Sequence, residues 1–366
     1  SRPALPSAVF DLNPPSLADL RRSVHKKSNK ACPGINGIPY IVYKRCPVVL
    51  GLLHSLVRKI WKRKSVPNDW AVAFIILLAK SDHLDMPQEF RPIAVGNTNG
   101  KIFFSVVSDR LQAHLVNNQY IKRDVQKGFL SGVAGCIDHA FTLGEALKEA
   151  KREKKAIVVT WIDLANAYGS VRHNFIQFAL NWYYVPEFIQ ALIFDYYDKL
   201  CAFVTTAGWK TGFFLFDIGL FQGCVLSTIL FDCVFNLLLD FLSPQKCLGF
   251  KHKCGVQSLQ KAYADDLCLT KRLASDNQTV LTQMDRWLAW SITMKAKPSK
   301  CVSLAFRQFK RGVPSRDGFV PMTDTIYSSY DPLLLIAGQP VRCLLQPGVA
   351  SEFSESHFTD VWCGLT

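Results

Sequence analysis

The sequence lacks the features of secreted, disulfide-rich and membrane-spanning chains. Its 12 cysteines include no Cys-x-x-Cys pair, and its first residues carry no signal-peptide pattern. Neither a disulfide scaffold nor a zinc ribbon is therefore indicated. The tightest metal-like group is Cys247, His252 and Cys254, but we expect free thiols in a reducing compartment. The longest uninterrupted apolar run, Ala71–Ala79, has nine residues, whereas a membrane-spanning helix needs about 20.

A longer, mainly apolar stretch, Cys224–Leu242, contains Asp232, Asn236 and Asp240. Each aspartate at the centre of a membrane costs about 2.5–3.5 kcal/mol, so we interpret this stretch as a buried helix. We therefore expect an intracellular protein, in the cytoplasm, the nucleus or both, without a membrane partner. The chain begins at Ser1, which indicates a piece of a longer protein.

Acidic residues are scarce beside basic ones. The chain has 29 Asp+Glu against 43 Lys+Arg, a net charge of +14 and a pI near 9.2. Such a charge favours polyanionic partners, because basic surfaces release counterions from phosphates, although solubility alone also explains it. With 366 residues, of which 49% are hydrophobic, the chain can bury a large core divided into two or more subdomains.

Two segments place carboxylates at the end of a predicted strand and in a predicted turn, which are common positions for catalytic residues. Ala156–Leu164 is rich in β-branched residues and predicts a strand with Asp163 at its end. Lys261–Thr270 has two apolar arms around Asp265 and Asp266, which predicts a tight β-hairpin. If the strand and the hairpin are neighbours, the three carboxylates can hold two divalent ions for phosphoryl transfer, and hard oxygen ligands suit Mg²⁺. Alone, each acidic residue also fits a solvated turn.

A series of blocks along the chain, in order, resembles the reverse transcriptase domain of non-LTR (LINE-like) retrotransposons. Its palm motifs are similar to Asp163–Val171 (DLANAYGSV), Phe221–Ser227 (FQGCVLS) and Tyr263–Asp266 (YADD). The other matching blocks are Pro33–Pro39, Ala73–Lys80, Phe90–Ile93 through Lys101 and Arg110-Leu111, Gln126–Phe129, Trp290 through Lys300-Cys301, and the divergent Leu335–Gly338. Asn36 stands where the family usually has Asp.

The resemblance implies an α+β right-hand polymerase of fingers and palm, in which helices back an antiparallel palm sheet and the thumb is largely absent. It implies an RNA-directed DNA polymerase, a nucleotidyltransferase that adds dNTPs to a DNA primer on an RNA template. The implied cofactors are two Mg²⁺ ions, or Mn²⁺ in their place. The implied domains are an N-terminal extension with the start of the fingers (residues 1–60), the fingers (61–155) and the palm (156–310). A divergent primer-grip region with the chain end covers residues 311–366. The sequence does not indicate an oligomeric state.

The resemblance also assigns roles residue by residue. Asp163, Asp265 and Asp266 would be catalytic and would bind the metal ions together with the carbonyl group of Leu164. The implied substrate-binding residues are Lys80 and Arg91 for the triphosphate, Tyr168 as a steric gate against the ribose 2′-hydroxyl, Gln222 and Gly223 at the nascent base pair, and Lys300 near the leaving pyrophosphate.

Two other functions stay open at this point. Residues 311–366 diverge from the family and stop where a thumb would begin, which also fits a catalytically silent RNA-binding remnant. An RNA-dependent RNA polymerase is disfavoured by Tyr168, because an enzyme that accepts ribonucleotides needs room for the 2′-hydroxyl. Tyr168 also has a structural alternative, as an ordinary core residue.

Overall fold

The computed structural model describes residues 2–80, 86–308, 319–321, 335–336, 339–340 and 342–343. The chain forms two compact units, each built from two separate segments. The first unit comprises Ser1–Tyr120 and Tyr168–Val234, and the second comprises Ile121–Ala167 and Phe235–Thr366. These interleaved units divide the chain differently from the four consecutive domains of the sequence analysis, whose naming stays a prediction. Most of region 311–366, including Ala337 and Gly338 of the primer-grip block, lies outside the described residues.

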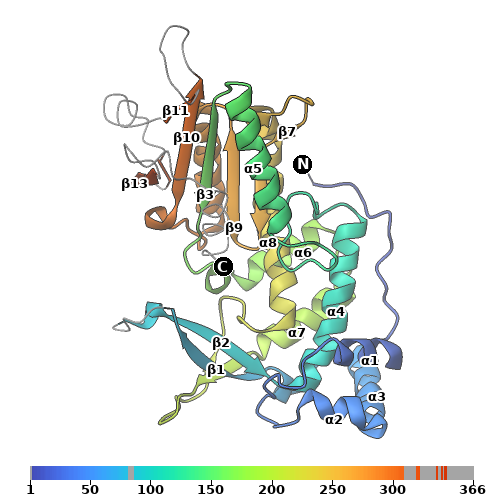
Figure 1. Cartoon of the computed structure of the whole chain (residues 1–366). Coiled ribbons are helices and arrows are strands. Elements are labelled where there is room, and N and C mark those ends of the chain that lie inside the picture. Colours follow the sequence, from blue (N-terminus) through green and yellow to red (C-terminus); the bar gives the residue numbers. More distant parts are fainter. Residues whose placement is uncertain are drawn as a thin grey trace. The chain divides into compact units, whose positions relative to one another are not determined.

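The first unit is mainly helical and carries one small sheet (Figure 1). Its helices are α1 (Leu17–His25), α2 (Tyr40–Arg45), α3 (Pro47–Arg63), α4 (Thr98–Asn117), α6 (His173–Trp182) and α7 (Glu187–Asp198). Its strands are β1 (Val72–Ala79), β2 (Phe90–Gly96), β4 (Cys201–Val204) and β5 (Phe214–Leu215), in the order β2-β1-β4-β5. Helix α8 (Val225–Leu242) begins in this unit and continues into the second.

Aromatic packing around α4 makes the core of the first unit. Phe103 is fully buried, and its ring centroid lies 6.3 Å from that of Trp61 on α3 and 5.7 Å from that of Trp70. Large rings bury much apolar area each, so few residues suffice to fix α4 against α3 and the start of β1.

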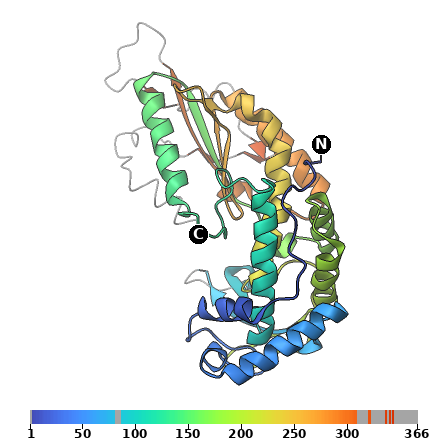
Figure 2. The same ribbon diagram turned by 90° about the vertical axis from the view of Figure 1, so that its right-hand side faces the viewer.

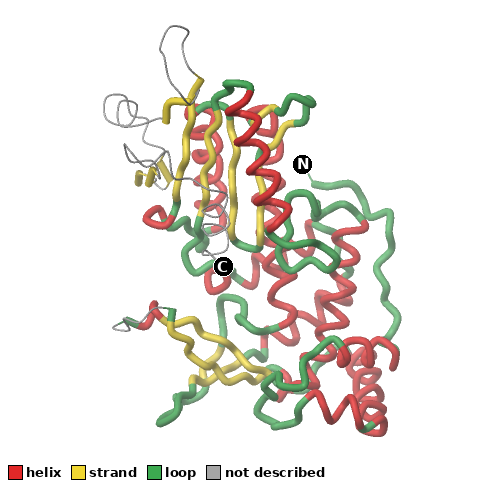
Figure 3. The backbone as a smooth tube through the Cα atoms, in the orientation of Figure 1, coloured by secondary structure: helices red, strands yellow, loops and turns green. Residues whose placement is uncertain are grey.

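The second unit is built on a six-stranded sheet, which Figure 3 shows as a continuous set of strands. Five strands follow the order β11-β10-β3-β9-β8 with antiparallel pairing throughout, and β14 pairs with β10 in parallel. The strands are β3 (Ile157–Ile162), β8 (Gln260–Tyr263), β9 (Asp266–Lys271), β10 (Val302–Gln308), β11 (Phe319–Pro321) and β14 (Arg342–Cys343). Two short pairs, β6 (Phe250–Lys251) with β7 (Gln257–Ser258) and β12 (Leu335–Ile336) with β13 (Gln339–Pro340), lie outside it.

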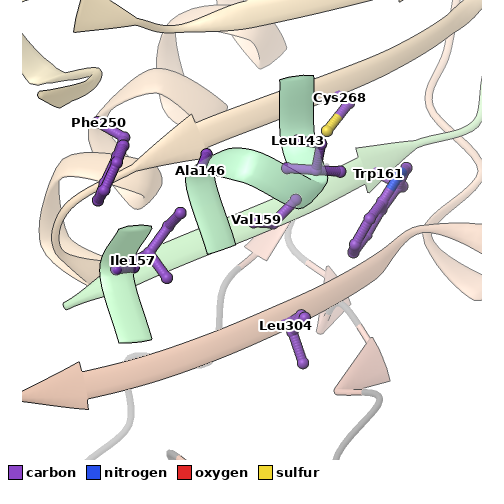
Figure 4. Close-up of a cluster of buried hydrophobic side chains, with 9 residues drawn as sticks. Leu143, Ala146, Ile157, Val159, Trp161, Phe250, Cys268 and Leu304 are labelled. Carbon is purple, nitrogen blue, oxygen red and sulfur yellow. The ribbon is translucent and has the colours of Figure 1, made fainter. Parts of the chain in front are cut away.

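Helices α5 (Ile137–Arg152) and α9 (Ala274–Ser291) pack on opposite faces of this sheet (Figure 2). On one face, Leu143 and Ala146 of α5 cover apolar side chains of β3, β9 and β10 (Figure 4). On the other face, Asn277 of α9 donates a hydrogen bond of 2.7 Å to the hydroxyl of Thr160 on β3. Every residue of β3 is buried, as expected for a strand that lies between two strands and two helices.

The apolar stretch Cys224–Leu242 is a buried helix, as expected from its three polar residues. Among the described residues, one helical segment, Val225–Leu248, is long and apolar enough to cross a membrane by composition, and 78% of its apolar window is buried inside the protein. The ten cysteines whose side chains the structure describes are free thiols.

The packing of α5 on the sheet yields a stability prediction. Leu143 is 5% exposed within the apolar cluster, so Leu143→Ala removes buried methyl groups and leaves a cavity. We expect the free energy of unfolding to fall by about 2–5 kcal/mol. The control is Lys151→Ala on the exposed side of the same helix, for which a change within about 0.5 kcal/mol is expected. Chemical denaturation measures both, and equal losses would contradict the assignment of this face.

Candidate active site

Three carboxylates meet at one edge of the sheet in the second unit. Strand β3 pairs with β9 so that Ile162 lies opposite Leu267. The next position along β3 is Asp163, and the preceding position along β9 is Asp266, so the antiparallel register places these two side by side. Asp265 precedes Asp266 in the turn between β8 and β9. The three acidic residues are therefore brought together, although 102 positions of sequence separate Asp163 from Asp265.

The hairpin that carries two of these residues differs slightly from its prediction. Tyr263 pairs with Asp266 across the hairpin, so the two-residue turn consists of Ala264 and Asp265, and Asp266 is already the first residue of β9. The sequence analysis placed both aspartates at the tip. The actual register makes Asp266 part of the sheet, which explains why it lies opposite the end of β3.

The backbone of Asp163 is held by Lys295–Lys297, a segment inside the matched block that runs from Trp290 through Cys301. The N–H of Lys297 donates to the carbonyl of Asp163 (2.8 Å), and the N–H of Ala165 donates to the carbonyl of Lys295 (2.8 Å). Leu164, whose side chain is buried, forms an antiparallel bridge with Ala296. The strand direction therefore persists for a few residues beyond β3, and it fixes the loop that presents Asp163. The sequence analysis matched this block to the family but assigned a role only to Lys300, because nothing in the sequence indicates which strand the block will lie beside.

Burial and mutual repulsion perturb the carboxylates. Burial, followed by the charges of Asp265 and Asp163, raises the pKa of Asp266 to about 7, against the opposing effect of Lys300. Burial also raises the pKa of Asp163, and the positive charges of Lys300 and Lys297 oppose this rise. Like charges held together in a partly buried place disfavour ionisation. The cluster thus stores electrostatic repulsion that a bound cation would relieve.

The three carboxylates can bind a hard cation only if water or substrate oxygens complete its coordination shell. Among the described residues, no three acidic, histidine or cysteine side chains lie close enough to enclose a metal ion by themselves. Mg²⁺ does not need such a cage, because it commonly binds one or two carboxylates and completes its shell with water and substrate phosphates. The strand register that places Asp163 beside Asp266, where burial and the neighbouring carboxylates raise the pKa of Asp266, is the observation that makes these carboxylates fit a divalent ion.

In the first unit, two basic residues share one face of the β1–β2 ribbon. Arg91 of β2 lies opposite Leu78 of β1, and Lys80 follows Leu78 by two positions, which returns its side chain to the same face. The N–H of Lys80 donates to the carbonyl of Glu89 (2.8 Å), so the ribbon pairing continues to Lys80. Both residues are exposed. The ribbon thus presents a point charge and a planar guanidinium together, a combination suited to phosphate groups.

The Gln222–Gly223 segment docks on the same ribbon. The carbonyl of Gln222 accepts a hydrogen bond from the N–H of Ala94 in β2 (2.7 Å). Gly223 has φ +102°, and a Cβ there would lie 2.7 Å from the carbonyl oxygen of Ala94. Only glycine satisfies both constraints. The same Cβ would lie 3.3 Å from Cγ2 of Ile93, which shares the ribbon face of Arg91 because the two are two positions apart on β2.

The backbone of Tyr168 is also tied to this region of the first unit. Its carbonyl accepts a hydrogen bond from the N–H of Leu220 (2.8 Å), two residues before Gln222. Its ring stacks on Phe231 of α8, with centroids 4.7 Å apart and planes 10° apart. The ring is only partly buried, so Tyr168 is neither a fully enclosed core residue nor a freely rotating one.

The candidate site residues therefore fall into two groups. The second unit gathers Asp163, Leu164, Asp265, Asp266 and Lys300. The first unit gathers Lys80, Arg91, Tyr168, Gln222 and Gly223 on or beside the ribbon. Within each unit the structure links the members of the group by strand register, hydrogen bonds or electrostatic interaction.

Comparison with known proteins adds independent information. Residues 78–320 match the family described as reverse transcriptase (RNA-dependent DNA polymerase). The chain is 26% identical over 290 residues to the retrovirus-related Pol polyprotein from the type-2 retrotransposable element R2DM of Drosophila melanogaster, covering 79% of this chain and 26% of that protein. It is 25% identical over 284 residues to the Pol polyprotein from the type-1 retrotransposable element R2 of Popillia japonica, covering 75% of this chain and 37% of that protein.

A solved structure of apo telomerase from Candida tropicalis, truncated from its C-terminal domain, is similar with a TM-score of 0.49 and 14% identity, covering 77% of this chain and 64% of that one. The matched part of the chain covers only about a quarter to a third of the length of the two retrotransposon polyproteins. The family match covers more than half of the chain and contains every candidate site residue. Together with the antiparallel sheet backed by helices, it confirms the predicted α+β right-hand polymerase class. The chain belongs to the reverse transcriptase (RNA-dependent DNA polymerase) family, as a domain of the non-LTR retrotransposon kind.

Proposed function

We propose that this chain is an RNA-directed DNA polymerase that adds dNTPs to the 3′-hydroxyl of a DNA primer on an RNA template. The observation that carries the proposal is the convergence of Asp163, Asp265 and Asp266 at one sheet edge, in a chain whose family is defined by this activity. The net charge of +14 supports nucleic-acid partners.

The carboxylates would act as ligands. Asp163, Asp265 and Asp266, with the carbonyl of Leu164, would hold Mg²⁺, or Mn²⁺ in its place. Two such ions, when bound, lower the pKa of an attacking hydroxyl and stabilise a leaving oxygen in phosphoryl transfer. The chain's own contribution is to hold these oxygens in fixed positions on a sheet, because positioning and charge neutralisation supply most of the rate in this chemistry.

The basic residues and the ribbon would bind substrate. Lys80 and Arg91 share a face of the ribbon, and we assign them to the triphosphate of the incoming nucleotide. Gln222 and Gly223 would lie against the nascent base pair, where a residue without a side chain permits close approach. Lys300, whose charge acts on Asp163 and Asp266, would neutralise the leaving pyrophosphate.

Removal of one carboxylate tests the proposal directly. We expect Asp265→Ala to lower primer extension on an RNA template by about 10²- to 10³-fold, since a carboxylate that would hold the catalytic metal ions is lost. The matched control is Asp124→Ala, an exposed aspartate of the same unit, which should keep full activity. Equal extension by the Asp265→Ala variant and the unchanged chain would contradict the assignment. RNA binding by the unchanged chain without any extension would instead favour a silent RNA-binding remnant.

The stacked ring of Tyr168 predicts sugar selectivity. We expect Tyr168→Ala to relax discrimination against ribonucleotides by about 10- to 200-fold, as steric rejection of a small group is typically worth. Tyr168→Phe keeps the ring stacked on Phe231 and should retain discrimination. The measurement is the ratio of kcat/KM for dNTP and rNTP incorporation. An unchanged ratio in the alanine variant would show that another residue acts as the gate.

The raised pKa of Asp266 predicts a pH-dependent stability. Its pKa is about 7 in the folded protein against a usual 3.8. Between these values the folded state keeps a proton that the unfolded state has lost, so stability falls as pH rises and the penalty is complete above about pH 7. In Asp266→Asn this penalty is absent. Without divalent cations, we expect the variant to be more stable than the unchanged chain by about 1–2 kcal/mol at about pH 8 and equal at about pH 4. Denaturation at both pH values measures this, and a less stable variant at pH 8 would refute it.

A further inference from the structure

A buried glutamine contacts the backbone of the acidic hairpin. Gln126 is 0% exposed. Its Oε1 accepts hydrogen bonds from the N–H groups of Ala264 (2.9 Å) and Gly128 (2.8 Å), and its Nε2 donates to the carbonyl of Ala264 (3.0 Å). The side-chain amide therefore satisfies both the N–H and the C=O of Ala264, the residue immediately before Asp265. Buried amides keep such partners because losing one leaves a polar group unsatisfied, at a cost of about 1–3 kcal/mol.

The segment around Gln126 runs beside β8 and forms a parallel bridge with Ala262. The N–H of Ala262 donates to the carbonyl of Val125 (2.8 Å), and the N–H of Lys127 donates to the carbonyl of Ala262 (3.0 Å). Gly128 then makes the closest approach, since a Cβ on it would lie 2.1 Å from the nitrogen of Ala264. No side chain fits there, so Gly128 allows the segment to lie directly against the turn.

A buried histidine fixes this segment to the rest of the unit. Nε2 of His139 on α5 lies 2.9 Å from the carbonyl of Val125 and 3.2 Å from that of Ala262. Because carbonyl oxygens only accept, this nitrogen carries the proton and donates to both. Burial lowers the pKa of His139 to about 4, so the ring stays neutral at physiological pH. The Gln126 segment is thus anchored to α5, which itself packs on the sheet.

The turn needs such support because its backbone is strained. Ala264 has φ +54°, the left-handed region, which costs an L-residue with a Cβ about 1–2 kcal/mol. Left-handed geometry in a non-glycine residue persists only where the surroundings over-determine it. Two hydrogen bonds from Gln126 to Ala264 supply this support, and a third ties Gln126 to Gly128.

We propose that Gln126 is a positioning residue that fixes the Ala264–Asp265 turn and thereby the direction in which Asp265 presents its carboxylate. This inference rests on the proposed polymerase function for its catalytic consequence, while the fixing of the turn itself does not. Gln126 acts through backbone atoms and touches no substrate. Metal-binding carboxylates tolerate displacements of only about 0.5 Å, so loosening the turn should slow the chemical step more than it weakens nucleotide binding.

Substitution by an apolar residue of similar length tests the proposal. In Gln126→Met, we expect kcat for primer extension to fall about 10- to 100-fold and the Mg²⁺ concentration for half-maximal activity to rise, with KM for dNTP changed less than about twofold. The matched control is Gln190→Met. Gln190 is 7% exposed and donates to Asn181 Oδ1 (2.9 Å) and to the carbonyl of Val185 (2.8 Å) in the first unit. It should lose stability but keep kcat.

A second variant, at Gly128, perturbs the same turn by a different contact. Gly128→Ala introduces a methyl group where the nitrogen of Ala264 lies, so it should reproduce the loss of kcat. If both residues act on one turn, the double variant should be no slower than the slower single variant. Multiplied losses in the double variant would overturn the proposal, as would an unchanged kcat in Gln126→Met.

Amide hydrogen exchange decides the positioning claim without any activity. In substrate-free protein, peptides covering Ala262–Asp266 should exchange faster in Gln126→Met than in the unchanged chain, and at the unchanged rate in Gln190→Met. Unaltered exchange in Gln126→Met would refute the fixing of the turn. If the unchanged chain extends no primer, the proposed function fails, and the exchange experiment alone decides whether Gln126 fixes the turn.

Discussion

The pairing of β3 with β9 is the interaction on which the candidate site depends. Backbone hydrogen bonds from Val158↔Lys271 to Ile162↔Leu267 set a register, and that register alone makes Asp163 a neighbour of Asp266. A shift of one residue would turn the side chains of β3 to the opposite face of the sheet. Trp161 and Val159 would then face α9 and no longer α5. The apolar cluster under α5 therefore stabilises the register that places Asp163 beside Asp266, because a pairing shifted by one residue would remove the side chains of β3 from this cluster.

Within this frame, the charges are balanced against one another. Folding places three carboxylates together in a partly buried position, which disfavours their ionised forms, and Lys297 and Lys300 at the same edge offset part of that repulsion. The arrangement is less stable than a neutral sheet edge would be. Functional sites commonly hold charges in unfavourable proximity, because the same proximity creates affinity for an ion of the opposite sign.

Local patterns sufficed to predict the elements but not their mutual contacts. The β-branched run before Asp163 and the paired arms around Asp265 predicted a strand and a hairpin, since these depend on neighbouring residues. The contribution of Gln126 was missed, although its block had been matched to the family. Its partner Ala264 is 138 residues away, and nothing near Gln126 in the sequence indicates that this segment will lie beside β8. The exact turn was also missed, because the register of Tyr263 with Asp266 is set by the sheet and not by the preference of aspartate for turns.

The position of β3 in the sheet has a consequence for synthesis of the chain. Both of its partners, β9 and β10, follow it at a distance. At ribosomal speeds of about 5–20 residues per second, roughly a hundred residues must be added before β9 is complete, which takes about 5–20 s. During that interval a mainly apolar strand lacks both of its neighbours in the sheet. The nascent chain must therefore be shielded from aggregation, by the preceding α5 or by a chaperone, until the last strands emerge.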